Sequence, residues 1–171
     1  MLILGIDPGS RLTGFGLINA VGHNVEYISS GCIKIADGPI ADKLKQIHSS
    51  INQLIEEYCP QEFAIEQVFM GKNADSALKL GQARGAAILS AAMQDIDVFE
   101  YAPRTVKQAV VGKGSAGKES VQFMVQRLLS LPGIPQADAA DALAIALCHA
   151  HTRAGQIQQV GRTQYRRGRR R

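Results

Sequence analysis

Three strand-like segments fill the first 35 residues of the chain, before any helical periodicity appears. Residues 2–7 are a compact apolar run that ends at Asp7, and a Pro-Gly-Ser turn separates them from the glycine-containing segment 12–18. Residues 24–35 alternate between apolar and polar side chains over much of their length. Because short turns between successive strands favour antiparallel pairing, we expect the chain to open with an antiparallel meander.

The remainder of the chain alternates between helical and strand-like patterns. Apolar residues at steps of three and four predict an amphipathic helix over residues 39–58, which ends before Pro60. Two further strands are expected at residues 62–69 and 97–101. Further helices are expected at residues 73–94, 103–110, 119–131 and 136–152. This order predicts the α/β class, with a mixed five-stranded sheet flanked by helices.

Charge is unevenly distributed along the chain. Residues 1–152 hold all 15 acidic residues and 12 of the 19 Lys and Arg residues, so this part carries a formal charge of −3, whereas the last 19 residues carry +7. We therefore expect one domain over residues 1–153 and a disordered, Arg-rich arm over residues 154–171. The arm would attract a polyanion, or would only improve solubility.

Several classes of protein are excluded by composition. No apolar run approaches the ~18–20 residues that cross a bilayer, so no membrane association is expected. The first residues, MLILGID, lack the basic region of a secretory signal. The three cysteines, Cys32, Cys59 and Cys148, show no CxxC spacing, which fits reduced thiols in a cytoplasmic protein better than a disulfide framework or a zinc site.

Four carboxylates occupy positions where a carboxylate is costly. Asp7 ends an apolar strand, and Glu66 lies inside the apolar segment AIEQV. Asp138 and Asp141 are three residues apart at the start of the last helix, so they share one helical face. Because an unpaired buried carboxylate costs several kcal/mol, such residues normally pair with cations or bind metal. If the first and fourth strands are neighbours, Asp7 and Glu66 approach to roughly 5 Å.

The four acids together predict a site for divalent cations. Their charge of about −4 matches two ions, and oxygen-only ligands favour Mg²⁺, with Mn²⁺ as a substitute, over zinc. Two such ions ~3.5–4 Å apart activate a water and stabilise the leaving oxygen in phosphodiester cleavage. Taken singly, Asp7 could form an Asx turn, Asp138 could cap the last helix, and Asp141 could favour its first turn. Glu66 has no comparable local explanation.

A glycine-rich segment, GKGSAGK at residues 112–118, resembles a nucleotide-binding phosphate loop. The next residue is Glu119, where Ser or Thr should hold Mg²⁺, so nucleotide binding is not expected. The Asp-Pro-Gly start also resembles the actin-like sugar kinases, which need two such domains and a longer chain. The glycine-rich segment is more consistent with a basic loop that presents Lys113 and Lys118 to a phosphate backbone.

Other residues near the acids suggest contacts to nucleic acid. Arg104 and Lys107 lie three apart on one predicted helix, where they form either a phosphate-contacting edge or a solvated face. Phe69 ends the Glu66 strand, where an aromatic ring could stack on bases or wedge between them. Phe69 could equally remain a core residue or a helix staple.

Three long segments, GIDPGSRLTGFG, FAIEQVFMGKNADSALKLGQARG and PQADAADALAIAL, resemble the RuvC family of Holliday-junction resolvases, which have the RNase H-like fold. The resemblance runs from Leu4 to about His149. It implies that the metal-binding catalytic carboxylates are Asp7, Glu66, Asp138 and Asp141. It also implies that Phe69 inserts or stacks at the junction core, and that Lys107 and Lys118 lie near the scissile strand.

The resemblance further implies an activity and partners. It implies a Mg²⁺-dependent crossover junction endodeoxyribonuclease, a homodimer that nicks two strands of like polarity in four-way DNA and leaves ligatable nicks. The RuvA–RuvB branch-migration motor is the implied partner. The small face around Gly81 and Gly85 could form the dimer seam or pack on its own sheet. Two alternatives are a YqgF-type RNA-processing nuclease with the same fold and a non-catalytic junction-binding protein.

Overall fold

A five-stranded mixed sheet forms the centre of the protein. The computed structural model describes residues 1–22, 24–68 and 73–167, with residues 156–167 described by backbone alone. The strands are β1 (Leu2–Asp7), β2 (Leu12–Val21), β3 (Asn24–Lys34), β4 (Glu62–Glu66) and β5 (Asp97–Tyr101), in the spatial order β3-β2-β1-β4-β5. The first three strands pair antiparallel, and β4 pairs parallel with both β1 and β5. The predicted opening meander and mixed sheet are therefore confirmed.

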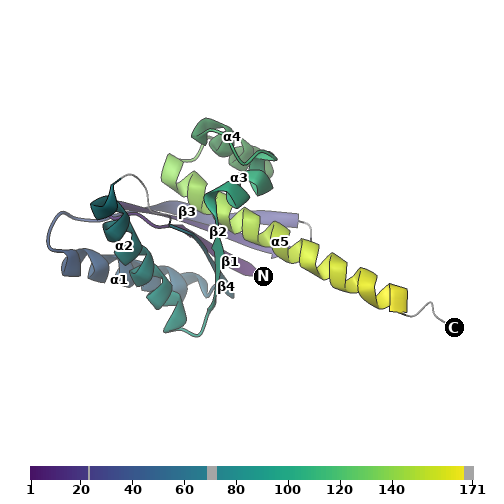
Figure 1. Ribbon diagram of the computed structural model, residues 1–171, viewed down its shortest axis with the longest axis horizontal. Helices are drawn as coiled ribbons and strands as arrows, with labels where there is room; N and C mark the ends of the chain where they lie inside the picture. The colour runs from purple at the N-terminus through teal and green to yellow at the C-terminus, as the bar shows by residue number, and fades with distance from the viewer. Residues whose placement is uncertain (23, 69–72, 168–171) are drawn as a thin grey trace.

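Five helices cover the two faces of this sheet, as Figure 1 shows. On one face lie α1 (Ile40–Tyr58) and α2 (Ala74–Ala92). On the other face lie α3 (Pro103–Val111), α4 (Lys118–Leu128) and the long α5 (Ala137–Arg167). Each helical layer closes its own apolar core against the sheet. The central strands are consequently buried on both sides, as parallel strands usually are.

Strand alternation decides which face each carboxylate meets. Leu4 and Ile6 of β1 pack in the core under α1 and α2, so the odd-numbered residues face α5. In β4, Phe63 and Ile65 belong to that same core. Asp7 at the end of β1 and Glu66 at the end of β4 therefore both point to the α5 side.

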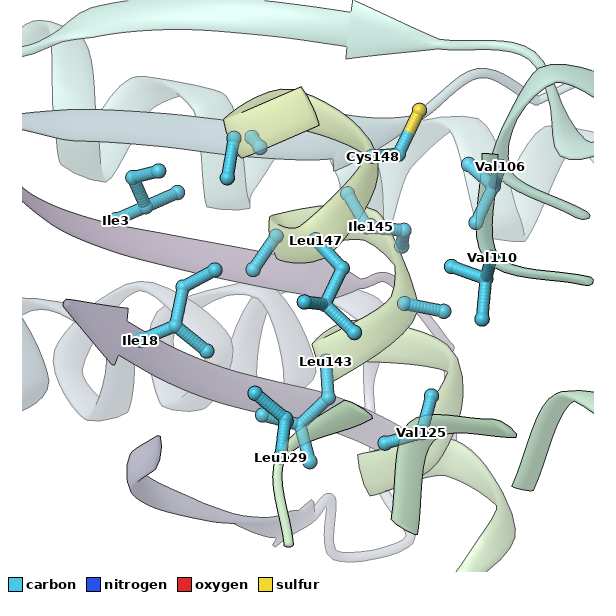
Figure 2. Packing of buried hydrophobic residues seen from close by; sticks show 14 of the residues in the cluster. Ile3, Ile18, Val106, Val110, Val125, Leu129, Leu143, Ile145, Leu147 and Cys148 are labelled. Carbon is cyan, nitrogen blue, oxygen red and sulfur yellow. The ribbon is translucent and has the colours of Figure 1, made fainter. Parts of the chain in front are cut away.

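The last helix lies very close to the backbone of β1 and β2. A Cβ atom on Gly5 would lie 2.3 Å from the carbonyl oxygen of Ala142, and one on Gly14 would lie 2.1 Å from that of Asp138. Only glycine allows this approach, because no side chain then separates the strand from the helix. In Figure 2, Leu143 and Leu147 of α5 complete the core beside Ile18 of β2.

Some boundaries differ from the sequence prediction. The last helix was expected to end near Thr152, but α5 continues to Arg167, since this segment contains no proline and its two glycines are isolated. The predicted helix 119–131 ends at Leu128, and Ser130 adopts a left-handed conformation with φ of 50°. None of the described helices is both long and apolar enough to cross a bilayer.

Candidate active site

Three of the four predicted acids line one pocket at the carboxyl ends of the central parallel strands. Asp7, Glu66 and Asp141 come from β1, β4 and α5, and the pocket volume is about 210 Å³. Lys107 of α3 and Lys118 of α4 line the same pocket. The rest of the wall is apolar and consists of Pro103, Val106 and Val121. The elements that contribute these groups are far apart in sequence, so only the complete fold assembles the pocket.

Asp7 and Glu66 are brought together by the parallel register of β1 and β4. Ile6 pairs with Ile65, so the next residue of each strand is Asp7 and Glu66. The register therefore places the two residues side by side at the ends of adjacent strands, whose general spacing is ~4.8 Å. The sequence did not establish that β1 and β4 are neighbouring strands, and the structure shows that they are.

Asp138 stands beside this pocket and is held by a neighbouring amide. Gln136 Nε2 donates a hydrogen bond to Asp138 Oδ2 over 2.9 Å. The Gln136 side-chain oxygen accepts from the backbone N–H of Ala139 at 3.3 Å and from the thiol of Cys32 at 2.5 Å. The side chain that caps the start of α5 is thus Gln136, so the helix-cap interpretation of Asp138 was wrong.

Burial and mutual repulsion raise the pKa of three acids in the site. Burial, followed by the charges of Glu66, Asp141 and Asp138, raises the pKa of Asp7 to about 8, against the lowering effect of Lys118. Burial and Asp141 raise the pKa of Glu66 to about 7. The pKa of Asp141 is also raised, mainly by burial, while Lys118 lowers it. The two lysines therefore compensate only part of the negative charge that the fold concentrates here.

The donor chemistry of this cluster fits a divalent cation. All four acids offer oxygen ligands, which Mg²⁺ and Mn²⁺ prefer, and a cation would relieve the repulsion that raises these pKa values. Within residues 1–22, 24–68 and 73–155, no three Asp, Glu, His or Cys side chains are arranged to hold a metal ion as they stand. Residue types and charge fit the ion; Asp138 accepts its hydrogen bond from Gln136 and does not line the pocket.

The predicted basic residues separate into two groups. Lys118 Nζ lies 3.8 Å from Asp141 Oδ2, and its side chain is 73% exposed, so it can reach a phosphate at the pocket mouth. Lys107 joins it in the pocket, whereas Arg104 and Lys113 do not line it. Arg104 instead packs against Gly114 in the glycine-rich loop. Phe69 lies outside the described residues, so its predicted contact with DNA stays a prediction.

Arg84 is a site neighbour that the sequence did not reveal. Its Nε donates to the backbone carbonyl of Glu66 at 3.1 Å, and its guanidinium pairs with Glu100 on β5. Arg84 therefore fixes the end of β4, where the strand leaves the sheet. No local pattern could have found this contact, because 18 residues separate Arg84 from Glu66.

A buried polar chain ties α5 to the sheet away from the pocket. His149 is fully buried; its Nε2 donates to Glu62 Oε2 over 2.5 Å, and its Nδ1 lies 2.6 Å from the Tyr101 hydroxyl. Arg153 also pairs with Glu62, at 2.7 Å. Burial lowers the pKa of His149, which keeps the imidazole neutral and able to accept from Tyr101. His149 thus positions α5 on β4 and β5 and lies apart from the acids.

The raised pKa values predict how pH affects the metal-free protein. The folded state holds protons on Asp7 and Glu66 more tightly than the unfolded chain, so their contribution to stability is lost as pH rises from about 4 to about 8. Asp7→Asn removes the part of this pH-dependent loss of stability that comes from Asp7. In EDTA, we expect the variant to melt above the native protein at pH 8 by about 3 °C or more, and the difference to shrink towards pH 5.

Thermal melting between pH 5 and pH 8.5 measures this effect. Asp97→Asn, which neutralises an exposed acid on β5, is the matched control and should show no such trend. A difference that stays constant with pH would exclude the proposed electrostatic cause. Added Mg²⁺ should raise the melting temperature of the native protein more than that of Asp7→Asn.

Comparison with known proteins assigns the chain to a family. The family described as crossover junction endodeoxyribonuclease RuvC matches residues 3–149, which include all four acids. The chain belongs to the RuvC family. It is 61% identical over 160 residues to RuvC of Pseudoalteromonas translucida, with 94% of this chain and 92% of that one covered. It is 64% identical over 150 residues to RuvC of Marinobacter nauticus, with 88% and 86% covered.

Solved RuvC structures share the fold. Thermus thermophilus RuvC aligns with a TM-score of 0.81 at 33% identity, covering 91% of this chain and 97% of that one. T. thermophilus RuvC in complex with Holliday junction substrate aligns with a TM-score of 0.84 at 34% identity, covering 91% and 96%. The expected RNase H-like fold is therefore confirmed.

Family membership also settles the class of enzyme. As a RuvC member, the chain is a crossover junction endodeoxyribonuclease, a hydrolase that cleaves DNA, and RuvC nucleases are metal-dependent. The alternatives of a YqgF-type RNA-processing nuclease and a non-catalytic junction-binding protein are not supported by these relatives.

All three cysteines are free thiols, as their spacing predicted.

Proposed function

We propose that this RuvC enzyme resolves four-way DNA junctions by Mg²⁺-dependent hydrolysis of one phosphodiester bond in each of two strands of like polarity. The observation that carries this proposal is the pocket of Asp7, Glu66 and Asp141, in which burial and repulsion leave the carboxylates short of positive charge. A T. thermophilus relative bound to a Holliday junction supports the choice of substrate. The products would be nicks that a ligase can seal.

In this proposal the four acids hold two Mg²⁺ ions. The ions would supply an activated water nucleophile and stabilise the departing 3′ oxygen. Asp7 and Glu66 would provide ligands from the strand ends, Asp138 from the first turn of α5, and Asp141 from three residues further along the same helix. Gln136 orients Asp138 through its amide hydrogen bond.

The two pocket lysines act on the phosphate. Lys118 and Lys107 enter from α4 and α3 and would bind the non-bridging oxygens, where negative charge develops during attack. The apolar wall formed by Val106 and Val121 limits access of bulk water from that side. Lys118 Nζ lies 3.8 Å from Asp141 Oδ2, so its ammonium group is close to the acids, and because exposed ion pairs are weak it can turn to a phosphate.

We also propose that the enzyme acts as a homodimer through the outer face of α2. A Cβ added at Gly81 or Gly85 would meet no described atom within 4 Å other than its chain neighbours and the nearby backbone of its own helix, so this face does not pack on the sheet. Leu78, Leu89 and Met93 are 66%, 52% and 64% exposed on the same helix and the turn that follows it. An unpartnered apolar face of this kind fits a two-fold contact, which would present two equivalent active sites to a four-way junction. RuvA–RuvB stays the proposed partner and the cytoplasm the proposed compartment.

A nicking assay tests the proposed reaction. A synthetic four-way junction with restricted branch migration and several crossover sequences is incubated with protein and Mg²⁺ or Mn²⁺. We expect paired, symmetric nicks that T4 DNA ligase can reseal, since each subunit of a dimer meets an equivalent strand. EDTA should abolish the nicks, and a linear duplex of the same sequence should remain intact.

Two outcomes would contradict the proposal. Equal cleavage of the linear duplex would exclude selection of the junction, and cleavage in excess EDTA would exclude the metal. Nicks that appear singly and independently in the two strands would argue against the dimer but not against the chemistry.

A further inference from the structure

A second basic hollow lies on the α1–α2 side of the sheet, opposite the helices that wall the catalytic pocket. Its volume is about 250 Å³. Three cationic side chains line it, each from a different element: Arg11 from the β1–β2 turn, Lys43 from α1 and Lys79 from α2. Ser10, Gly38 and Ile40 complete the lining. Residues 1–152 have a formal charge of −3, so a hollow lined by three cations differs from the average surface of this part of the chain.

The turn that carries Arg11 is held firmly relative to the catalytic pocket. The fully buried Thr13 hydroxyl donates to the carbonyl of Gly9 at 3.0 Å and accepts from its N–H at 3.3 Å. A Cβ on Gly9 would lie 1.9 Å from the carbonyl oxygen of Leu12, so the turn is also tightly closed. The N–H of Ile35 donates to the carbonyl of Arg11 at 2.9 Å. The backbone of Arg11 is therefore fixed on both sides.

The cations of this hollow are available to an external anion. Lys43 pairs with Asp37 at 3.3 Å, and Lys79 pairs with Asp75 at 2.6 Å. Asp37 and Asp75 are largely exposed, at 94% and 72%, whereas the side chains of Lys43 and Lys79 are 18% and 55% exposed. The Lys79–Asp75 pair is exposed on both sides and contributes only about 0–1 kcal/mol, and Asp37 is itself solvated, so a phosphate can replace both acids. In the described part of the chain Arg11 forms no ion pair.

The hollow is also within reach of a DNA strand in the active site. Ser10 follows Asp7 by three residues, so their Cα atoms are separated by at most about 11 Å. A DNA strand advances ~3.4 Å per phosphate along the helix axis. A strand whose scissile phosphate lies beside Asp7 and that continues across the end of β1 would therefore bring another phosphate to Ser10 and Arg11 within about three nucleotides.

We propose that this hollow is a second phosphate subsite, which binds a backbone phosphate of the DNA within about three nucleotides of the cut. The Arg11 guanidinium, the two ammonium groups and the Ser10 hydroxyl would donate to its oxygens. The DNA would then cross the end of β1, from the lysines of α3 and α4 to the cations of α1 and α2. This inference rests on the proposed function and adds a second anchor to it.

Salt dependence of junction binding tests the subsite. In Glu66→Gln protein, which is used so that DNA stays uncut, Arg11→Ala and Lys43→Ala should each weaken binding between 50 and 200 mM NaCl. Each should lower the slope of log K against log [NaCl] by about 0.9, the value for one lost phosphate contact. Lys45→Ala, an exposed lysine on α1 outside the hollow, is the matched control and should leave the slope unchanged.

Neutral backbone linkages then locate the phosphate. Methylphosphonates are placed singly at each of the five positions on either side of the cut. One of them should weaken binding by the Arg11-containing protein and have no further effect on Arg11→Ala. A lack of coupling at every position, or a Lys45→Ala slope that falls as far as that of Arg11→Ala, would overturn the subsite.

The same variants and substrates distinguish a failure of this inference from a failure of the proposed function. With Glu66 intact, Arg11→Ala should need a higher concentration of junction than Lys45→Ala to reach half of its maximal cutting rate, because the subsite holds DNA. Equal half-saturating concentrations for the two variants would overturn the assignment as a binding subsite. If the native protein cuts no junction, the proposed function fails, while the methylphosphonate coupling still decides whether the hollow binds phosphate.

Discussion

Glu66→Gln is expected to lower the rate of junction cleavage by at least about 10²–10³-fold, while the junction is bound as well as by the native protein or better. Gln keeps the size of the side chain but removes the negative charge that a metal ion needs. Glu66 also repels the phosphate backbone, so its neutralisation favours DNA binding. Single-turnover cleavage in Mg²⁺ and a gel-shift titration measure the two effects separately.

The fold should be unaffected by this change. The pKa of Glu66 is raised to about 7, so the metal-free native protein already carries this side chain partly protonated near neutral pH. Glu57→Gln, on an exposed position of α1, is the matched control and should cut and bind normally. Retained cutting together with lost binding would remove Glu66 from the catalytic cluster.

Gly14→Ala should damage both stability and catalysis, because it adds one methyl group where α5 rests on β2. The new Cβ would lie 2.1 Å from the carbonyl oxygen of Asp138, and that backbone atom cannot move unless the helix start moves with it. Overpacking of this kind costs about 1–3 kcal/mol. A displacement of about 1 Å at a catalytic group can cost 10²-fold in rate, so we expect a comparable loss of cleavage.

Urea unfolding and cleavage well below the melting temperature measure the two losses. Gly133→Ala is the control, since its added Cβ meets nothing within 4 Å and its φ is not positive. That variant should be as stable as the native protein or more stable by up to about 1 kcal/mol. If Gly14→Ala unfolds and cuts like Gly133→Ala, α5 is not seated on β2 as described.

The strands and the two strand-borne acids were predictable because their signals are local. An apolar run ending in Asp7 and a glutamate inside AIEQV are visible within one segment, and alternation then assigns both to the same sheet face. The same period-of-two argument places Glu62 on the α5 side, where it meets His149. Only the adjacency of β1 and β4 had to be supposed.

The supporting contacts were not predictable because they join segments without a shared pattern. Gln136 caps α5 and orients Asp138, although Ser, Thr, Asp and Asn are the usual capping residues. Arg84 reaches the carbonyl of Glu66 from a different helix. The basic hollow likewise gathers Arg11, Lys43 and Lys79 from three elements. Each depends on tertiary approach, which sequence spacing does not encode.

The order of the elements along the chain determines when the four acids can come together during synthesis. Asp7 belongs to the first strand to be synthesised, and Asp138 and Asp141 belong to the last helix. At about 5–20 residues per second, several seconds of translation separate them. During that interval the nascent chain carries strands and basic side chains but no complete acid cluster. If the four acids act together as proposed, the enzyme would not hydrolyse nucleic acid near the ribosome until α5 has been released and has folded onto the sheet.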